Sequence, residues 1–198
     1  MPMLPSPERM EKIRACCMEL MEQGETLGAM DIANRLMRLP ELPMHCPYHH
    51  FLVPAALLTA ARMTDGNREA LEKDLAAAME RSGQIPGGTC GLYGCCGAAI
   101  GAGIFASIYQ KTTPTSKHGW AADNAMTARC LQNVAAVEGP RCCKRVTWLT
   151  LQAAIPAAKE LLGVDLGEAS NISREYYTKN RECRGKDCPF FPAEDEDI

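Results

Sequence analysis

The chain has 198 residues, enough for the core of one compact domain, and its formal net charge is −3 at pH 7. This slightly acidic balance excludes the strongly basic surface of most nucleic-acid-binding domains, and no stretch reaches the roughly 18 uncharged apolar residues of a membrane span. The first residues lack the basic stretch and apolar core of a secretory signal, so we expect a cytoplasmic protein without a nucleic-acid or membrane partner.

The first half of the chain predicts four helices, because apolar residues recur there at helical spacing. The first helix is expected to begin at Pro7, and the second to cover about residues 28–38. Pro54 suits the first turn of the third helix, where its missing N–H is harmless. Asn67 is the expected N-cap of the fourth.

The second half predicts three longer helices behind a glycine-rich loop at residues 85–94. The first of them, at about residues 95–109, carries small residues at every fourth position: Gly94, Ala98, Ala102 and Ala106. Such a bare face lets another helix or a cofactor come within backbone distance. Helices at about residues 120–137 and 141–162 follow, and Pro156 predicts a kink or break in the last one.

We therefore predict a mostly α protein, a single compact helical domain of about seven helices with a cysteine-bearing C-terminal tail. Residues 1–44 are expected to form a helical hairpin that packs on the core. Residues 45–167 would be the helical core with its cysteine-rich loops, and residues 168–198 a Cys-x4-Cys segment followed by an acidic tail. The run from Glu194 to Asp197 is expected to be solvated and without a binding role.

Eleven cysteines are the most informative feature of the composition. Disulfides rarely persist in the cytoplasm, so clustered cysteines there indicate metal or redox chemistry, and so many thiols favour an anaerobic host. The candidate metal ligands stand in close pairs or beside glycine, proline and basic residues: Cys46, Cys90, Cys95, Cys96, Cys142, Cys143, Cys183 and Cys188.

The spacing of these cysteines is typical of iron–sulfur proteins. Two Cys-x4-Cys loops contain glycine, and two cysteines are followed directly by proline, as in ferredoxin motifs. Cys95 and Cys96 lie where a helix should begin, and so do Cys142 and Cys143. A helix N-terminus favours thiolates and an anionic cluster.

Three basic residues near the second adjacent pair are candidate anion- or substrate-binding groups: Arg141, Lys144 and Arg145. Adjacent helical residues diverge by roughly 100° of rotation, so we expect one cysteine of each adjacent pair to face a shared centre. The sequence does not assign which one.

Three other cysteines are predicted to be core residues, because Cys17 and Cys130 lie on apolar helical faces and Cys16 is beside the first of them. The few histidines leave two interpretations open. His49 or His50 could complete a mixed zinc site with Cys46, or they could cap the loop before the following helix.

The stretch Cys90–Phe105, with Gly139–Arg145 downstream and Cys46–His49 upstream, resembles an uncharacterised cysteine-rich domain family of anaerobic bacteria and archaea. In that family the domain stands alone, or is fused to or encoded near S-adenosylmethionine-dependent methyltransferases. The resemblance covers most of the chain and implies an anaerobe's cytoplasmic protein. No methyltransferase glycine motif follows a strand here, so this chain would be the stand-alone form.

Three functions remain open. We favour an iron–sulfur protein, with a [4Fe–4S] cluster, that handles electrons or sulfur for a small molecule or a redox protein. It is favoured because cysteines far outnumber histidines and exceed what one zinc ion needs. One alternative is a zinc-stabilised helical binding module that partners a methyltransferase. The other is a metal-free thiol enzyme with Cys142 or Cys96 as nucleophile and Arg141 or Lys144 lowering its pKa.

Overall fold

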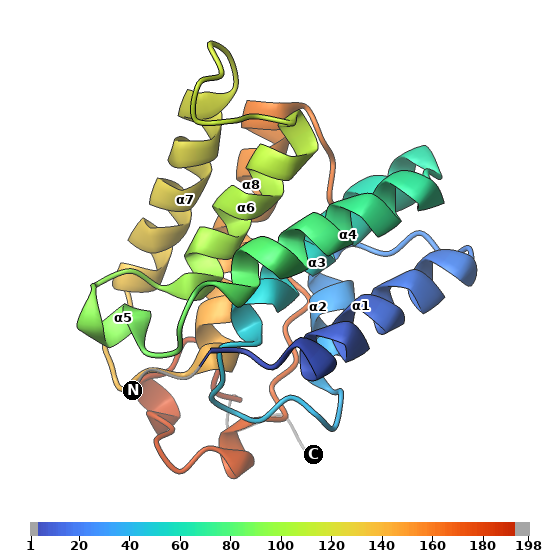
Figure 1. Cartoon of the computed structure of the whole chain (residues 1–198). Coiled ribbons are helices and arrows are strands. Elements are labelled where there is room, and N and C mark those ends of the chain that lie inside the picture. The colour runs from blue at the N-terminus through green and yellow to red at the C-terminus, as the bar shows by residue number, and fades with distance from the viewer. Residues whose placement is uncertain (1–3, 193–198) are drawn as a thin grey trace.

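The computed structural model describes residues 4–192, which form eight α-helices and two 3-10 helices with no strand in that range (Figure 1). The elements are α1 (Pro7–Glu22), α2 (Ala29–Met37), α3 (His49–Asp65), α4 (Arg68–Gly83), α5 (Thr89–Leu92), α6 (Gly97–Gln110), α7 (Trp120–Ala135), α8 (Cys143–Leu162), η1 (Tyr177–Lys179) and η2 (Gly185–Asp187). The predicted helical single domain is confirmed. The helix beyond the expected seven is α5, one turn within the segment predicted as a loop. No described helix is long and apolar enough to cross a membrane.

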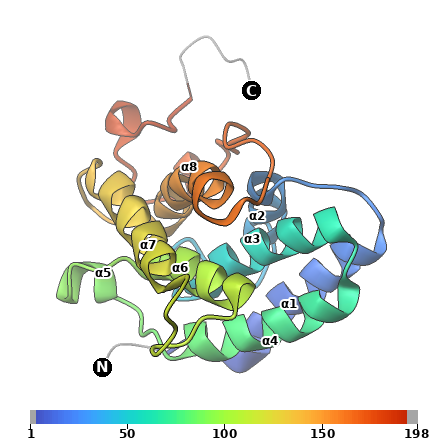
Figure 2. The same cartoon turned by 90° about the horizontal axis from the view of Figure 1, so that it is seen from above.

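Helix α3 is the centre of the bundle. Every residue from His49 to Ala61 is buried, as expected of a helix that is apolar on all sides. Helices α1 and α4 pack on one side of it and α6 and α8 on the other, while α2 also contacts it and α7 lies outside α6 and α8 (Figures 1 and 2). Because α3 contacts five other helices, its N-terminal end is held in a fixed position relative to theirs.

Pro54 lies inside α3, so its predicted place in the first turn is wrong. The helix begins five residues earlier, because a side chain from another helix replaces the hydrogen bond that proline cannot make. Proline has no N–H to donate to the carbonyl oxygen four residues before it, which belongs to His50. The hydroxyl of Ser82 in α4 donates to that oxygen instead, at 3.3 Å.

The predicted close approach of the small-residue helix α6 is present, but glycines rather than the predicted alanines make it. A Cβ atom at Gly101 would lie 2.7 Å from the His50 carbonyl oxygen and 2.8 Å from the Pro54 ring. A Cβ at Gly97 would overlap the His50 imidazole. These two glycines therefore let the backbone of α6 lie directly against the start of α3.

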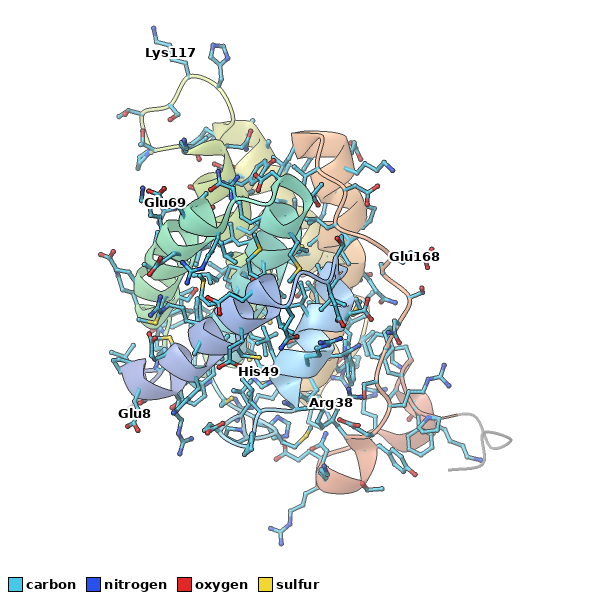
Figure 3. All side chains as sticks on the ribbon, turned by 90° about the vertical axis from the view of Figure 1, so that its right-hand side faces the viewer. Glu8, Arg38, His49, Glu69, Lys117 and Glu168 are labelled. Carbon is cyan, nitrogen blue, oxygen red and sulfur yellow. The ribbon has the colours of Figure 1, made fainter. Side chains whose placement is uncertain are left out.

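Helix α8 begins at Cys143 rather than at Arg141 and continues through Pro156 to Leu162, so of the predicted kink or break the break is absent. At the far end of α6, the connector to α7 extends away from the body of the bundle, with Lys117 near its tip (Figure 3).

The C-terminal segment, residues 163–192, has only two short 3-10 helices and is held by side chains of the bundle. Trp148 in α8 donates from Nε1 to Oδ1 of Asn34 at 3.0 Å. Asn34 in turn donates from Nδ2 to the carbonyl oxygen of Asn171 at 2.7 Å. The Trp148 ring also packs against the rings of Tyr176 and Phe190. The predicted acidic run from residue 194 to 197 lies outside the described residues.

Candidate metal centre

A cavity of about 460 Å³ lies where the N-terminal ends of α3, α6 and α8 meet. Its wall contains four of the predicted ligands: Cys46, Cys90, Cys96 and Cys143. They lie close enough together to interact electrostatically. Charge on Cys46 or Cys96 raises the pKa of Cys143, and charge on Cys90 raises the pKa of Cys96. Sulfur atoms from four distant positions in the sequence therefore surround one cavity.

Each of the three helices brings one of these cysteines. Cys46 lies just before α3, Cys96 is the N-cap residue of α6, and Cys143 is the first residue of α8. Cys90 is contributed by α5. Backbone N–H groups at a helix N-terminus are without intrahelical partners and carry a partial positive charge. Three such ends at one cavity favour an anionic occupant.

The first turns of these helices differ from those of the others. An acidic residue stands in the first turn of each of four helices away from the cavity: Glu8 in α1, Asp31 in α2, Glu69 in α4 and Asp123 in α7. The first turns of α3, α6 and α8 contain none. The usual partner of a helix N-terminus is therefore missing where the cysteines gather.

His49, the first residue of α3, has an imidazole nitrogen without a partner. Its Nδ1 lies 3.1 Å from the carbonyl oxygen of Cys46 and 3.2 Å from the Cys46 sulfur. A carbonyl only accepts hydrogen bonds, so this contact assigns the hydrogen to Nδ1 and leaves a lone pair on Nε2. Nε2 is buried without a hydrogen-bond partner among the described residues, and the residue is only 1% exposed. His49 lines the cavity and can offer that lone pair to a ligand.

Burial keeps this histidine and the nearby thiols neutral in the absence of an occupant. Desolvation lowers the pKa of His49 well below its usual value and raises the pKa of the Cys46 thiol. The proton of the pair therefore stays on sulfur, which disfavours a preformed thiolate–imidazolium pair. Burial likewise raises the pKa of Cys96, against the opposing effect of the Ala98 and Ala99 amides, and raises that of Cys143 to about 12.

Two buried cations stand beside these neutral thiols. Lys144 is 1% exposed and donates from Nζ to the carbonyl oxygen of Met37 at 2.9 Å. Arg145 is 3% exposed and donates to the carbonyl oxygens of Glu138 and Pro140 at 3.0 and 2.7 Å. Neither forms an ion pair with a carboxylate within residues 4–192, although buried charges are normally paired.

Desolvation also lowers the pKa of Lys144 to about 8. Electrostatic attraction opposes this and raises the pKa, and it comes from the neighbouring Cys46, Cys143 and Cys142. Of the three predicted anion-binding residues, Arg141 and Arg145 line the cavity, whereas Lys144 lies behind it. The local charge is therefore positive, and an anion at the thiols would compensate it.

The remaining predicted ligands lie elsewhere. Cys142, Cys183 and Cys188 line a second, smaller cavity of about 30 Å³, and Cys95 lines neither cavity. The adjacent pair Cys142–Cys143 is thus divided between two cavities. The predicted core positions of Cys17 and Cys130 are confirmed, since both are fully buried, and Cys16 packs at the edge of the same core.

Within the described range, no three His, Cys, Asp or Glu side chains are already close enough together to hold a metal ion. Binding a metal at either cavity therefore requires the thiols to turn inward. Cysteine has a single side-chain rotation, which moves its sulfur between staggered positions.

Two parts of the cavity wall were missed by sequence reasoning. The C-terminal end of α7, the loop directly after it and the start of α8 contribute an apolar wall of Val134, Val137 and Val146. The second part is the free lone pair of His49: the sequence indicated His49 or His50 as a possible zinc ligand with Cys46 or as a cap of the loop, but not that Nε2 of His49 would be buried without a partner in the described part of the chain.

The fold and the cavity together define a helical protein with a cysteine-lined centre. A family of unknown function, DUF5714, matches residues 13–191, and the chain belongs to this family. The predicted resemblance to an uncharacterised family is therefore confirmed. No curated protein and no solved structure matches the chain.

Proposed function

We propose that the chain is an iron–sulfur protein whose cluster, of the [4Fe–4S] type, is held by Cys46, Cys90, Cys96 and Cys143. The observation that carries this proposal is the placement of these four cysteines around one cavity at three helix N-termini. Four thiolates are the usual ligand set of such a cluster. The protein would handle electrons or sulfur for a small molecule in the cytoplasm of an anaerobe.

The charge distribution supports an anionic cluster over neutral thiols. Burying a cation without a carboxylate partner is costly, and here Lys144 and Arg145 are both buried next to the cavity. A cluster with four thiolate ligands carries net negative charge and would balance them. N–H groups of the helix ends would also donate to the sulfur atoms, as outer-shell groups do in metal sites.

The size of the cavity supports a role in small-molecule chemistry. A volume of about 460 Å³ lies within the range of pockets that hold small molecules. Its walls combine the three valines with a few polar groups, among them the His49 lone pair and the Arg141 side chain. Arg141 is exposed and adds positive charge at the cavity, so the pocket suits a small anionic molecule.

A zinc ion at the same cavity is the alternative, as part of a helical module that partners a methyltransferase. The observation that favours it is the unpartnered Nε2 of His49, because zinc accepts mixed cysteine and histidine ligands. The two proposals differ in the metal found and in the residue set that holds it. A metal-free thiol enzyme is less favoured, because burial raises the pKa of the cavity thiols.

The experiment is metal and sulfide analysis of protein purified without oxygen. We expect brown protein with a broad visible absorption shoulder and acid-labile sulfide in proportion to iron. Serine variants of Cys46, Cys90, Cys96 and Cys143 should each lose iron. The matched controls are serine variants of Cys16 and Cys130, which lie outside the cavity.

Three outcomes would contradict the proposal. Colourless protein with one zinc ion, lost on His49→Asn, would establish the alternative. Equal iron in all six cysteine variants would show that the cavity does not hold the cluster. Protein without metal that is alkylated at one cavity cysteine with loss of activity would indicate a thiol enzyme.

A further inference from the structure

A second group of three cysteines lies apart from the proposed cluster. Cys142, the N-cap residue of α8, lines a small cavity together with Cys183 and Cys188 of the C-terminal segment. Cys188 is close enough to Cys142 for its charge to raise the pKa of that thiol. The predicted Cys-x4-Cys pair therefore lies near the first member of the Cys142–Cys143 pair, and not at the larger cavity.

Backbone N–H groups already point at two of these sulfur atoms. The amide of Arg145 donates to the Cys142 sulfur at 3.4 Å, and the amide of Gly185 donates to the Cys183 sulfur at 3.4 Å. The second contact uses a tight turn in which Gly185 has a φ of 58°, a conformation that suits glycine. Donors of this kind stabilise sulfur as thiolate and are typical of the outer shell of metal–cysteine sites.

A buried guanidinium, which donates to two backbone carbonyls but forms no ion pair with a carboxylate in the described part of the chain, reaches the same cavity. Arg145 lines it, and Nε of Arg145 is buried with no hydrogen-bond partner in the described part of the chain. The guanidinium is always charged, so a group of negative charge is expected beside it. A divalent metal ion with three thiolate ligands has net negative charge and provides one.

The C-terminal segment has little structure of its own to keep it folded. Apart from the 3-10 helices η1 and η2 it has no regular element in residues 163–192. It is anchored by Asn34, by aromatic contacts to Trp148, and by Arg184, which donates to the carbonyl oxygen of Gly139 at 2.6 Å. Small segments without a core are often fastened by a metal ion.

We propose that Cys142, Cys183 and Cys188 hold one zinc ion, which fastens the C-terminal segment to the start of α8. The cavity of about 30 Å³ suits a single ion and is far smaller than the space at the first cavity. Zinc takes four ligands in a tetrahedron. No other Cys, His, Asp or Glu among the described residues lines this cavity, so the fourth position takes a water molecule or a small anion. This site uses none of the ligands of the proposed cluster, although Arg145 lines both cavities and its charge enters both proposals.

Adjacent residues provide the sharpest test, because Cys142 and Cys143 face different cavities. Zinc and iron are measured in the same anaerobic preparations of the full chain, grown with zinc supplied. Cys142→Ser should lose zinc and keep iron, whereas Cys143→Ser should lose iron and keep zinc. Loss of an outer-shell partner alone weakens metal affinity by roughly 10–100-fold, so loss of a ligand should weaken zinc affinity at least as much.

Cobalt supplies a spectroscopic readout that does not depend on iron. Protein loaded with Co²⁺ should show thiolate-to-metal charge transfer in the near ultraviolet and the visible bands of a tetrahedral ion. Cys183→Ser and Cys188→Ser should abolish both signals, whereas Cys95→Ser, which lines neither cavity, should retain them. The metal-loaded wild type should also resist proteolysis after residue 163 better than the metal-free protein.

The proposal is overturned if the wild type binds neither zinc nor Co²⁺ through thiolate. It is also overturned if Cys142→Ser and Cys143→Ser lose the same metal, which would mean one shared centre. Failure of the cluster proposal looks different, since it would leave the protein with zinc but without iron and sulfide.

Discussion

The two ends of helices α3, α6 and α8 are built differently. Their C-terminal ends close on residues in the left-handed conformation, Gly66, Lys111 and Gly163, with φ between 58° and 70°. The N–H groups of Lys111, Gly163 and Asn67, which follows Gly66, donate to carbonyls of the last turn, so the chain completes these ends itself. The N-terminal ends have no acidic residue in the first turn, and α6 and α8 have a cysteine as the N-cap residue, where Ser, Thr, Asp or Asn is usual; the N-cap of α3 is Tyr48. The difference teaches that the chain completes one end of each helix itself, while the other end lacks its usual partners, as the proposed anionic occupant of the cavity would require.

The largest expected effect comes from disturbing how the N-terminal ends meet. In Gly101→Ala the new Cβ would lie 2.7 Å from a backbone oxygen of α3, so α6 must shift. Overpacking of this kind costs about 1–3 kcal/mol of unfolding free energy, and the shift should also lower iron content. Urea unfolding and iron analysis measure both. Gly91→Ala is the control for stability alone, because nothing lies within 4 Å of its Cβ position but Gly91 itself lines the cavity beside Cys90. Equal stability of the two variants would show that the close approach is not required.

Removing a buried charge should affect the loaded and the metal-free protein differently. Lys144→Met loses the hydrogen bond to Met37 and the contact of Nζ with the Tyr176 ring, 4.8 Å from its centroid, but also removes a buried cation that forms no ion pair with a carboxylate in the described residues. In the metal-free protein we expect these effects to offset each other within about 1 kcal/mol. In the cluster-loaded protein the variant should lose about 1–3 kcal/mol, because the charge then has an anionic partner. Anaerobic urea unfolding of both forms measures this, and the same change in both would contradict an anionic occupant.

Replacing a capping cysteine by a better cap separates binding from folding. Serine is a favoured N-cap residue, so Cys96→Ser should leave the metal-free protein as stable as before, or more stable by up to about 1 kcal/mol. The same variant should fail to retain iron. Thermal unfolding and iron analysis are the measurements. Cys17→Ser is the opposite control, since it buries a hydroxyl in the core and should lower stability by about 1–3 kcal/mol while iron is retained. Loss of stability in metal-free Cys96→Ser would show that this cysteine serves the fold.

The smallest effect is expected at the other end of α6. Lys111 is the non-glycine residue with positive φ among those described, at 58°. Lys111→Gly should raise the free energy of unfolding by up to about 1 kcal/mol, because glycine adopts this conformation without strain. Iron content should not change. A stability change accompanied by altered iron would show that the two ends are coupled.

Local signals in the sequence predicted much of this arrangement. The starts of α6 and α8 lie within two residues of the predicted ones, and the core positions of Cys17 and Cys130 follow from periodicity. The close approach of α6 follows from residue size, although the glycines that make it were not the predicted positions. These features depend on neighbours along the chain.

Features that depend on tertiary contacts could not be predicted. The long α3 contains Pro54 only because Ser82, from another helix, satisfies the carbonyl that proline leaves without a donor. The divergence of Cys142 and Cys143 was expected from helical geometry, but the direction of each depends on where α3 and the C-terminal segment lie. For the same reason the sequence did not distinguish Cys95 from Cys96 as the residue at the first cavity.

The connector between α6 and α7 offers a practical route to study this chemistry. It extends from the bundle with Lys117 near its tip, well separated from His49 at the start of α3 (Figure 3). With eleven native thiols, maleimide coupling would not be selective for any one position. A short enzymatic ligation peptide inserted beside Lys117 would instead tether the molecule to an electrode or bead with its sulfur-rich end facing the solution.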